Sequence, residues 1–311
     1  MTDRAVLADV AHRLDGLATP DVPLGPLTTY RVGGPAALLA RVEDDGDLAR
    51  VTGAVHATGV DVLVVGKGSN LLVADAGFPG LAVVLGERFA AIDVEGTTVR
   101  AGGAAALPVV ARRSVAVGLA GFEWAVGVPG SIGGGVRMNA GGHGSDLAAV
   151  LVGIRLLDLR TGEDGRVSAS ALDLGYRRSS VAPHQLVLEA ELALAPGDPE
   201  AGAELLAEIV AWRRANQPGG PNAGSVFANP DGDAAARLID DAGAKGLRHG
   251  TAAVSTKHAN FIQADEGGRA DDVFALMGEV RALVLRATGI ELRAETRCVG
   301  FTLNPRSEVE G

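Results

Sequence analysis

The chain contains an unusually glycine-rich stretch from Gly127 to Gly144, which reads Gly-Val-Pro-Gly-Ser-Ile-Gly-Gly-Gly-Val-Arg-Met-Asn-Ala-Gly-Gly-His-Gly. Nearly half of its residues are glycine, and its only full charge is Arg137. Glycine loses more backbone entropy on folding than any other residue, so such a cluster needs positive φ angles or a close approach of the backbone to another group. The stretch predicts a loop whose bare N–H groups bind a phosphate-bearing cofactor, or a compact loop without a ligand.

Length and composition describe an ordinary globular chain with two domains, or with three layers in one domain. The chain has 311 residues, of which 47% are apolar and 21% are charged, and this length exceeds the usual size of a single core. Its 44 glycines indicate many tight turns rather than disorder, because the apolar content stays high. The net charge of −10 argues against nucleic acid or an anionic membrane as a partner, although a local group of residues could still bind a small anion.

Cysteine content and apolar runs indicate the compartment. The single cysteine, Cys298, excludes an internal disulfide and a cysteine-built zinc site. No apolar run reaches the ~18 residues of a membrane span, and Asp3, Arg4 and Asp9 interrupt the apolar run that a signal peptide needs. We therefore expect a cytoplasmic protein that binds no membrane.

Hydrophobic periodicity predicts an α+β arrangement in the first half of the chain. It predicts a helix over 3–15, a stiff proline connector over 20–26, a strand over 36–42, a helix that Asp44, Asp45 or Asp47 caps and Gly59 ends, and a strand over 62–65. Short strands are expected over 83–85, 92–94 and 98–101, and a helix begins at Leu107-Pro108 and ends at Gly118.

A second glycine turn follows the strand at 62–65 and reads Gly-Lys-Gly-Ser-Asn-Leu from Gly66 to Leu71. A dinucleotide-binding fingerprint needs glycine at position 71 and a helix beyond it, and a P-loop needs Ser or Thr after Lys67. The sequence predicts strand, turn and strand instead. The N–H groups of this turn could form an anion-binding nest, but an ordinary turn would show the same pattern.

The second half of the chain contains a predicted domain boundary. Strands are expected over 150–158 and 186–194, and the Pro/Gly-rich segment 195–199 then changes the composition. Beyond it, Asp198 caps a helix that carries Ile209 and Trp212, a further helix covers 235–242, and Asp271-Asp272 cap a helix that ends at Gly289. A last strand over 290–301 alternates charged and apolar residues, so its charged face is expected in solvent.

The candidate chemical residues, taken alone, also allow structural explanations. Arg177 and Arg178 form a small basic island that is typical of a solvated surface. Ser225 follows a glycine, but the Gly-x-Ser-x-Gly pattern of a nucleophile elbow fails at positions 223 and 227. His258 has no neighbouring cluster of His, Asp and Glu with metal-ligand spacing, so no metal site is expected.

Three segments together resemble the FAD-binding segments of the MurB family, the UDP-N-acetylenolpyruvoylglucosamine reductases. They are Tyr-Arg-Val-Gly-Gly at 30–34, Gly-Lys-Gly-Ser-Asn-Leu-Leu-Val at 66–73 and the glycine-rich stretch at 127–141. The resemblance extends from about Tyr30 to Gly300 through at least six motifs. It implies an α+β protein with an FAD-binding domain of the vanillyl-alcohol oxidase and p-cresol methylhydroxylase type, built from two subdomains, and a C-terminal α+β substrate-binding domain.

The resemblance implies domain bounds and cofactor residues. It places the FAD-binding domain at 1–197 with its subdomains divided near residue 95, the substrate-binding domain at 198–295, and a C-terminal strand and tail at 296–311. It implies non-covalently bound FAD, whose pyrophosphate both glycine turns face, and NADPH as co-substrate. The residues that it assigns to FAD are Tyr30, Arg31, Gly66, Lys67, Gly68, Ser69, Asn70, Leu71, Gly127, Pro129, Gly130, Ser131, Gly133, Gly134, Asn139 and Gly141.

The resemblance assigns the chemistry to residues outside the glycine-rich stretch. Tyr-Arg-x-Ser at 176–179 makes Arg177 the contact to the enolpyruvyl group, and Asn-Ala-Gly-Ser-Val-Phe-x-Asn-Pro at 222–230 makes Ser225 the proton donor. Glu295 matches the family's catalytic glutamate. The residues implied to contact the nucleotide-sugar substrate are Asn229, Lys257 and His258.

The implied reaction reduces UDP-N-acetylglucosamine enolpyruvate to UDP-N-acetylmuramate in peptidoglycan precursor synthesis. Only 48 positions separate Arg177 from Ser225, too few for the inserted tyrosine loop of one subgroup, so the chain resembles the shorter subgroup, and we expect a monomer. Gly142, His143 and Ala228 depart from the family pattern, which leaves details of the flavin and diphosphate contacts open. An FAD-dependent oxidase or reductase of the same fold with another nucleotide-linked substrate, or a non-enzymatic nucleotide-sugar binding module, remains an alternative.

Overall fold

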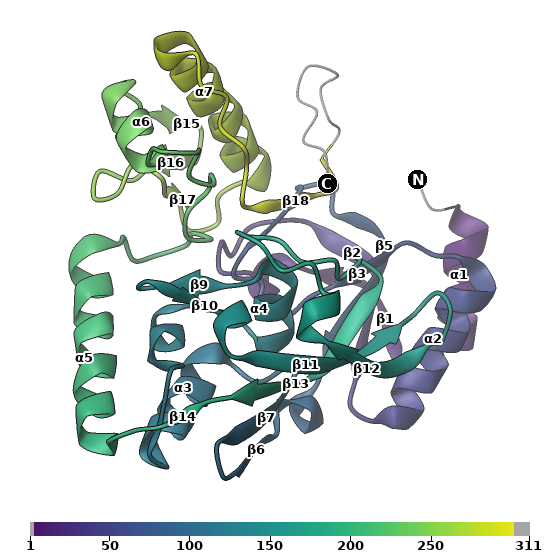
Figure 1. Cartoon of the computed structure of the whole chain (residues 1–311). Helices are drawn as coiled ribbons and strands as arrows, with labels where there is room; N and C mark the ends of the chain where they lie inside the picture. Colours follow the sequence, from purple (N-terminus) through teal and green to yellow (C-terminus); the bar gives the residue numbers. More distant parts are fainter. Residues whose placement is uncertain (1–2, 302–311) are drawn as a thin grey trace. The chain divides into compact units, whose positions relative to one another are not determined.

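The computed structural model describes residues 3–301 and groups them into two compact units (Figure 1). Within these residues, the first unit comprises 3–21, 37–67 and 79–213, and the second comprises 22–36, 68–78 and 214–301. The chain therefore passes from the first unit to the second inside the turn Gly66–Leu71, between Lys67 and Gly68. The division of the chain at residues 197 and 295 stays a prediction, and the end of the predicted tail, 302–311, lies outside the described residues.

The amino-terminal half of the first unit is a four-stranded sheet with two helices packed on it. The strand order is β1-β2-β5-β3, with β1 at Ala18–Pro23, β2 at Pro35–Val42, β3 at Val62–Val64 and β5 at Phe78–Leu85. Helices α1 (Arg4–Arg13) and α2 (Asp45–Thr58) bury their apolar residues in the same core. Of the three predicted cap candidates, Asp44 caps α2 by accepting a hydrogen bond from Asp47 N (2.9 Å), and Gly59 ends the helix in the left-handed region, as predicted.

The segment predicted as a proline connector is partly a strand. Residues 18–23 form β1 at the edge of the sheet. Proline has no N–H to donate, but an edge strand needs donors on one side only, so Pro20 and Pro23 are tolerated there.

The other half of the first unit is a five-stranded antiparallel sheet. The order is β12-β11-β13-β7-β6, with β6 at Ile92–Glu95, β7 at Thr98–Gly102, β11 at Leu151–Asp158, β12 at Asp164–Ser168 and β13 at Gln185–Ala193. Helices α3 (Leu107–Ala116) and α4 (Ile132–Met138) contribute buried residues to its core, and α5 (Pro199–Asn216) contributes Ile209. Two short strand pairs complete this half: β8 (Leu119–Ala120) with β14 (Ala195–Pro196), and β9 (Gly141–Gly142) with β10 (Ser145–Asp146).

The glycine-rich stretch is not a loop throughout, because residues 132–138 form α4. Ser131 caps this helix, its hydroxyl accepting a hydrogen bond from Gly134 N at 3.3 Å. Glycine is a poor helix former, but its bare backbone allows close packing: Gly133 N donates to Gly103 O (2.9 Å), and a Cβ on Gly135 would already lie 3.3 Å from Leu107. Tertiary packing therefore stabilises a helix that local propensity disfavours.

The second unit has its own core around a three-stranded sheet. Strands β15 (Arg248–His249), β16 (Ala252–Val254) and β17 (Ile262–Ala264) pack with α6 (Ala235–Asp241) and α7 (Ala270–Thr288) (Figure 1). A separate pair of parallel strands joins β4 (Leu71–Val73) to β18 (Arg297–Val299). The last strand is thus much shorter than the predicted 290–301.

The predicted cap of α7 is also wrong. The cap position is Arg269, and Asp271 and Asp272 lie in the first turn of the helix. The carboxylate that binds the helix amides comes from Asp75, which accepts a hydrogen bond from Ala270 N at 2.9 Å. Asp271 in turn accepts a hydrogen bond from Asp75 N at 3.1 Å. The cap is therefore supplied by a residue almost 200 positions away in the chain, which no local pattern reveals.

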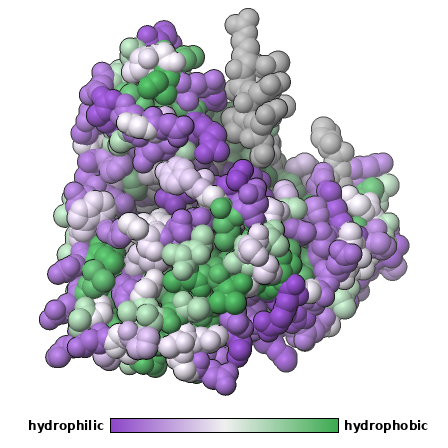
Figure 2. All heavy atoms as spheres, viewed as in Figure 1, coloured by the Kyte–Doolittle hydropathy of each residue, from purple (hydrophilic) through white to green (hydrophobic). Residues whose placement is uncertain are grey.

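Some hydrophobic side chains remain at the surface. On the face that Figure 2 shows, hydrophobic surface gathers in the lower part of the view, where Figure 1 draws β11 and β13. Val152 on β11 is 46% exposed, and Trp212 on α5, predicted as part of an apolar face, is 49% exposed. Among residues 3–301, no helix is long and apolar enough to cross a membrane.

Candidate active site

Two of the predicted cofactor segments meet within the first unit. Gly66, at the end of the strand-turn segment, lies against Ser131, which begins α4: a Cβ on Gly66 would lie 2.6 Å from Ser131 Oγ. Gly66 is exposed and carries no side chain, so its backbone is uncovered beside the amino-terminal end of a helix, where a pyrophosphate can bind, whereas Ser131 is buried. Gly134, in the first turn of α4, is exposed. This bare-backbone cradle fits the FAD that the sequence predicts.

The Tyr30–Gly34 segment packs against residues 68–74, which follow Lys67 in the turn Gly66–Leu71 and belong to the second unit. Gly68 has a φ of +59°, and its carbonyl oxygen accepts a hydrogen bond from Thr29 N at 3.2 Å. A Cβ on Gly33 would lie 2.7 Å from Val73 O, and Gly34 N donates to Ala74 O at 2.9 Å. The first two predicted motifs are therefore one packed structure.

The side chains of this structure differ in their accessibility. Tyr30 is fully buried in the core of the second unit, and burial raises the pKa of its phenol, so the ring is a neutral packing element. Arg31 is exposed, with a φ of +57°. Lys67 is exposed as well, whereas Ser69 is half-buried and Leu71 is buried in β4. Lys67 and Arg31 are therefore solvent-exposed cations of these segments.

The remaining glycines of the stretch allow close packing. A Cβ on Gly127 would lie 2.9 Å from Ile209 and 3.5 Å from the Nε2 of His143. His143 itself stands edge-on to Trp212, with ring centroids 5.1 Å apart, and both residues line a pocket of about 580 Å³. Gly130 O accepts a hydrogen bond from Leu107 N, Pro129 is exposed, and Gly141 pairs with Asp146 in the β9-β10 hairpin.

Arg177 occupies a tight turn of the first unit. Gly175 and Arg178 exchange backbone hydrogen bonds of 3.0 and 3.1 Å across it, and Arg177 has a φ of +55°. A non-glycine residue in the left-handed region costs roughly 1 kcal/mol, and such strain is concentrated at functional sites. The guanidinium carbon lies 5.2 Å from the centre of the Tyr176 ring, which makes a cation–π contact.

Asn139, predicted to contact FAD, is 2% exposed and bonded entirely to protein groups. Its Nδ2 donates to Asp146 Oδ2 (3.1 Å) and to Gly175 O (3.0 Å), and its Oδ1 accepts a hydrogen bond from Ala148 N (2.9 Å). Its amide is thus linked directly to the turn that carries Arg177.

Ser225 and Glu295 are brought together in the second unit. Glu295 N donates to the carbonyl oxygen of Val226 at 2.7 Å, and Phe227 forms a β-bridge with Ala294. The segments that carry the two residues are therefore paired, although seventy positions separate them in the chain. Both side chains are half-buried.

Two asparagines hold this pair of segments. The buried Asn260 accepts a hydrogen bond from Phe227 N (3.0 Å) and donates to Phe227 O (2.8 Å). Asn70 donates from Nδ2 to Glu295 O (3.0 Å), and its own carbonyl oxygen accepts a hydrogen bond from Arg297 N (3.0 Å). Asn260 was not among the predicted site residues, because its only local signal is one amide between Ala259 and Phe261. Arg177 belongs to the first unit, so its approach to Ser225 and Glu295 stays a prediction.

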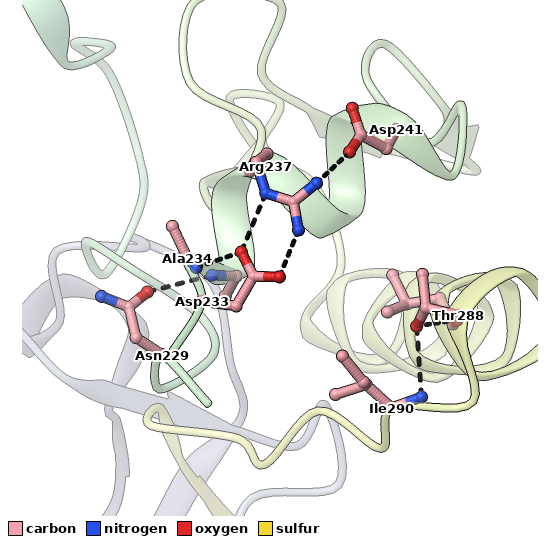
Figure 3. Close-up of polar contacts among 9 residues, drawn as sticks. Asn229, Asp233, Ala234, Arg237, Asp241, Thr288 and Ile290 are labelled. Carbon is pink, nitrogen blue, oxygen red and sulfur yellow. Dashed lines mark hydrogen bonds and ion pairs between the residues drawn. The ribbon is translucent and has the colours of Figure 1, made fainter. Parts of the chain in front are cut away.

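The predicted substrate residues all belong to the second unit. Asn229 accepts a hydrogen bond from Ala235 N at 3.0 Å at the start of α6, and Figure 3 shows its amide nitrogen on the side away from that helix. Lys257 donates from Nζ to the carbonyl oxygen of Arg214. His258 is half-buried against Phe261, and burial lowers the pKa of its imidazole. Within residues 3–301, no group of three or more His, Cys, Asp and Glu side chains could hold a metal ion.

Residues 36–167 match the sequence family described as FAD binding domain. Together with the bare-backbone cradle of Gly66 and Gly134, this match defines the class of the protein: it is a flavoprotein with an α+β FAD-binding domain, as predicted. Residues 216–299 match the family described as UDP-N-acetylenolpyruvoylglucosamine reductase, C-terminal domain.

Whole-chain relatives identify the family. The chain is 43% identical over 299 residues to a UDP-N-acetylenolpyruvoylglucosamine reductase from Acidiphilium cryptum, covering 96% of this chain and 95% of the relative. It is 43% identical over 294 residues to one from Paramagnetospirillum magneticum, covering 94% and 95%. The crystal structure of UDP-N-acetylenolpyruvylglucosamine reductase (MurB) from Thermus caldophilus superimposes with a TM-score of 0.79 at 33% identity, covering 91% of this chain and 98% of that one. The chain belongs to the UDP-N-acetylenolpyruvoylglucosamine reductase (MurB) family, which confirms the predicted resemblance.

Proposed function

We propose that the protein reduces the enolpyruvyl ether of UDP-N-acetylglucosamine to the lactyl ether of UDP-N-acetylmuramate, with NADPH as the electron donor. FAD, which the exposed backbone of Gly66 and Gly134 would hold, would supply a hydride carrier between NADPH and the vinyl carbon of the substrate. The proposal rests on the family relationship and, most directly, on the paired segments of Ser225 and Glu295. This pairing supports a proton-donating hydroxyl and a carboxylate acting in one site.

The substrate gains one further negative charge when the hydride has added to its vinyl carbon. The neighbouring carbon then carries carbanion character, which spreads into the substrate carboxylate. Arg177 is suited to bind this charge, because a guanidinium has a planar fork of donors that matches a carboxylate or enolate. Preorganised donors stabilise developing charge most strongly, and the tight turn between Gly175 and Arg178 supports such preorganisation.

Ser225 donates the proton that completes the reduction. A serine hydroxyl is a weak acid at neutral pH, but a carbanion is basic enough to take its proton within hydrogen-bond reach, ~2.6–3.2 Å. Glu295 shares a proton with the substrate carboxylate or orients its neighbours. Hydride and proton together saturate the double bond, and NADPH leaves as NADP⁺.

Three side chains of the second unit bind the nucleotide-sugar. Asn229 keeps its oxygen on Ala235 N, so its amide nitrogen is the group that can donate to a diphosphate. Lys257 supplies a cation. The lowered pKa of His258 keeps its imidazole neutral near pH 7, so it acts as a hydrogen-bonding group without charge.

An anaerobic absorbance experiment tests the proposed reaction. Purified protein should be yellow, NADPH should bleach it, and UDP-N-acetylglucosamine enolpyruvate should restore the colour without oxygen. Failure of the substrate to restore it would refute the reaction. A parallel titration with NADH tests the preference for NADPH, and denaturation should release FAD if the cofactor is non-covalent.

Two finer expectations, one on the oligomeric state and one on the compartment, belong to the same proposal. The protein is a monomer, which light scattering coupled to size-exclusion chromatography measures. It acts in the cytoplasm, which cell fractionation measures.

A further inference from the structure

We propose that Asn139 is a positioning residue for Arg177, acting through the turn Gly175–Arg178 and not through contact with FAD. The inference rests on the proposed role of Arg177 in binding the enolpyruvyl group. It follows from a set of hydrogen bonds that all lie within the first unit.

Every hydrogen-bonding group of the Asn139 amide is used inside the protein. An asparagine side chain offers two N–H donors and one carbonyl oxygen. The donors bond to Asp146 Oδ2 and Gly175 O, and the oxygen accepts a hydrogen bond from Ala148 N. With the side chain 2% exposed, no donor is left to bond a cofactor.

The end of α4 holds both arms of the Arg177 turn. On the arm before Arg177, Asn139 Nδ2 bonds to Gly175 O at 3.0 Å. On the arm after it, Ser179 Oγ donates to Arg137 O in the last turn of α4 at 2.7 Å. Both contacts join groups more than thirty positions apart in the chain. They fix the turn at two points, with the strained Arg177 between them.

Helix α4 connects this turn to the cofactor cradle. Its seven residues span roughly 10 Å, from the Ser131 cap beside Gly66 to Asn139. A short helix is rigid, so the position of the arginine turn is set relative to the backbone that binds FAD. Chemistry at a flavin requires such fixed geometry, since a misplacement of about 1 Å can slow a reaction about 100-fold.

Asparagine is the residue type that this position requires. Its backbone is left-handed (φ +39°, ψ +60°), a region that asparagine tolerates better than most non-glycine residues. Aspartate has the same shape but cannot donate to Gly175 O, and its charge would face Asp146. Glycine would keep the backbone and lose the amide.

The test measures the two half-reactions of Asn139→Asp separately by anaerobic stopped-flow absorbance. FAD content and flavin reduction by NADPH should stay within about twofold of wild type, because Arg177 is not needed for either. Reoxidation of the flavin by UDP-N-acetylglucosamine enolpyruvate should slow by about 100-fold. Reoxidation within twofold of wild type would overturn the inference.

A double-mutant cycle with Arg177→Ala separates positioning from a general loss of structure. If Asn139 acts through Arg177, adding Asn139→Asp to Arg177→Ala should slow reoxidation no further. Effects that multiply would overturn the inference. Substrate binding to the oxidised enzyme, followed by the flavin absorbance change, should show the same non-additivity.

A swap variant identifies which contact matters. Asn139→Asp with Asp146→Asn restores the hydrogen bond between the two side chains but not the donor to Gly175 O. This variant should stay slow, and full recovery would show that the Gly175 contact is irrelevant. The control is Arg178→Ala, which removes an exposed ion pair with Asp173 from the same turn and should react like wild type.

A second variant tests the inference if Asn139→Asp does not fold. Ser179→Ala removes the hydrogen bond to Arg137 O and so loosens the other arm of the turn. It should slow reoxidation at least tenfold with normal reduction by NADPH, and a wild-type rate would overturn the inference. A wild-type protein that is not reoxidised by the substrate would instead refute the proposed reaction itself.

Discussion

Replacing Gly66 by alanine should weaken both the cap of α4 and the binding of FAD. The new Cβ would lie 2.6 Å from Ser131 Oγ, and since real contacts stay above 3.0 Å, the hydroxyl must move by at least ~0.4 Å. Its hydrogen bond from Gly134 N is already 3.3 Å long and would break. Loss of a serine cap costs about 1 kcal/mol of unfolding free energy. A loss of the same size in cofactor binding raises the Kd of FAD about fivefold.

Urea denaturation of the apoprotein and a fluorescence titration with FAD measure the two effects. Ser131→Ala is the matched variant, because it removes the same cap without adding a clash. The double variant with Gly66→Ala and Ser131→Ala should be no less stable than Ser131→Ala alone, since the clashing hydroxyl is absent. Wild-type stability of Gly66→Ala, or stability losses that add in the double variant, would refute the reasoning. A different result is a double variant that is as stable as Ser131→Ala and still binds FAD more weakly than Ser131→Ala does. That result would show that the bare backbone of Gly66 contacts FAD directly.

Three other residues give independent predictions. Asn70→Ala removes the donor to Glu295 O, so the unfolding free energy should fall by about 1 kcal/mol. The substrate should also reoxidise the flavin more slowly, while reduction of the flavin by NADPH is unchanged. Equal stopped-flow rates of reoxidation in the variant and the wild type would contradict this prediction. Burial lowers the pKa of His258 below its ordinary 6.5, so the unfolded chain binds more protons and stability falls as the pH drops through 6.5 toward the lower folded value. His258→Phe should lose less stability than wild type between pH 7.5 and 5.5 in urea titrations, and equal losses would exclude this residue as a cause. Burial raises the pKa of Cys298 from 9.0 to about 12, so its thiolate is roughly 1,000-fold scarcer than that of an exposed cysteine. A thiol reagent at pH 8 should therefore label Cys298 only after the protein unfolds. Rapid labelling of the native protein would show that the thiol is accessible.

Elements with strong local signals were predicted correctly from the sequence. Helix α2 is an example, because its three candidate cap aspartates, its apolar stripe and its terminal Gly59 all lie within fifteen residues of one another, and the structure selects Asp44 as the cap. Such signals act over the distances that helix caps and turns span, so no knowledge of the fold is needed to read them. The family motifs were equally readable, and the comparisons confirm the family and its FAD-binding domain.

Elements that depend on distant partners were predicted less well. The glycine-rich stretch contains α4 because Gly103 and Leu107 pack closely on its bare backbone, and glycine propensity alone argues against a helix. The strand β1 forms because β2 is beside it, and α7 begins where Asp75 reaches it. Tertiary packing overrides local propensity in each case.

The candidate site shows the same contrast between local sequence signals and contacts with distant residues. Residue types alone left Arg177 as a surface arginine and Ser225 as a turn residue, and only the family motifs selected Arg177, Ser225 and Glu295 as candidates. The hydrogen bonds that hold these residues are visible only in the folded chain. Asn139 joins α4 to the turn of Arg177, and Asn70 donates a hydrogen bond to Glu295 O across 225 positions. An amide that bonds to a distant backbone carbonyl has no local pattern, because its partner is chosen by how the chain folds. The family motifs in the sequence therefore name the residues proposed for the chemistry, whereas the contacts that hold these residues depend on tertiary structure.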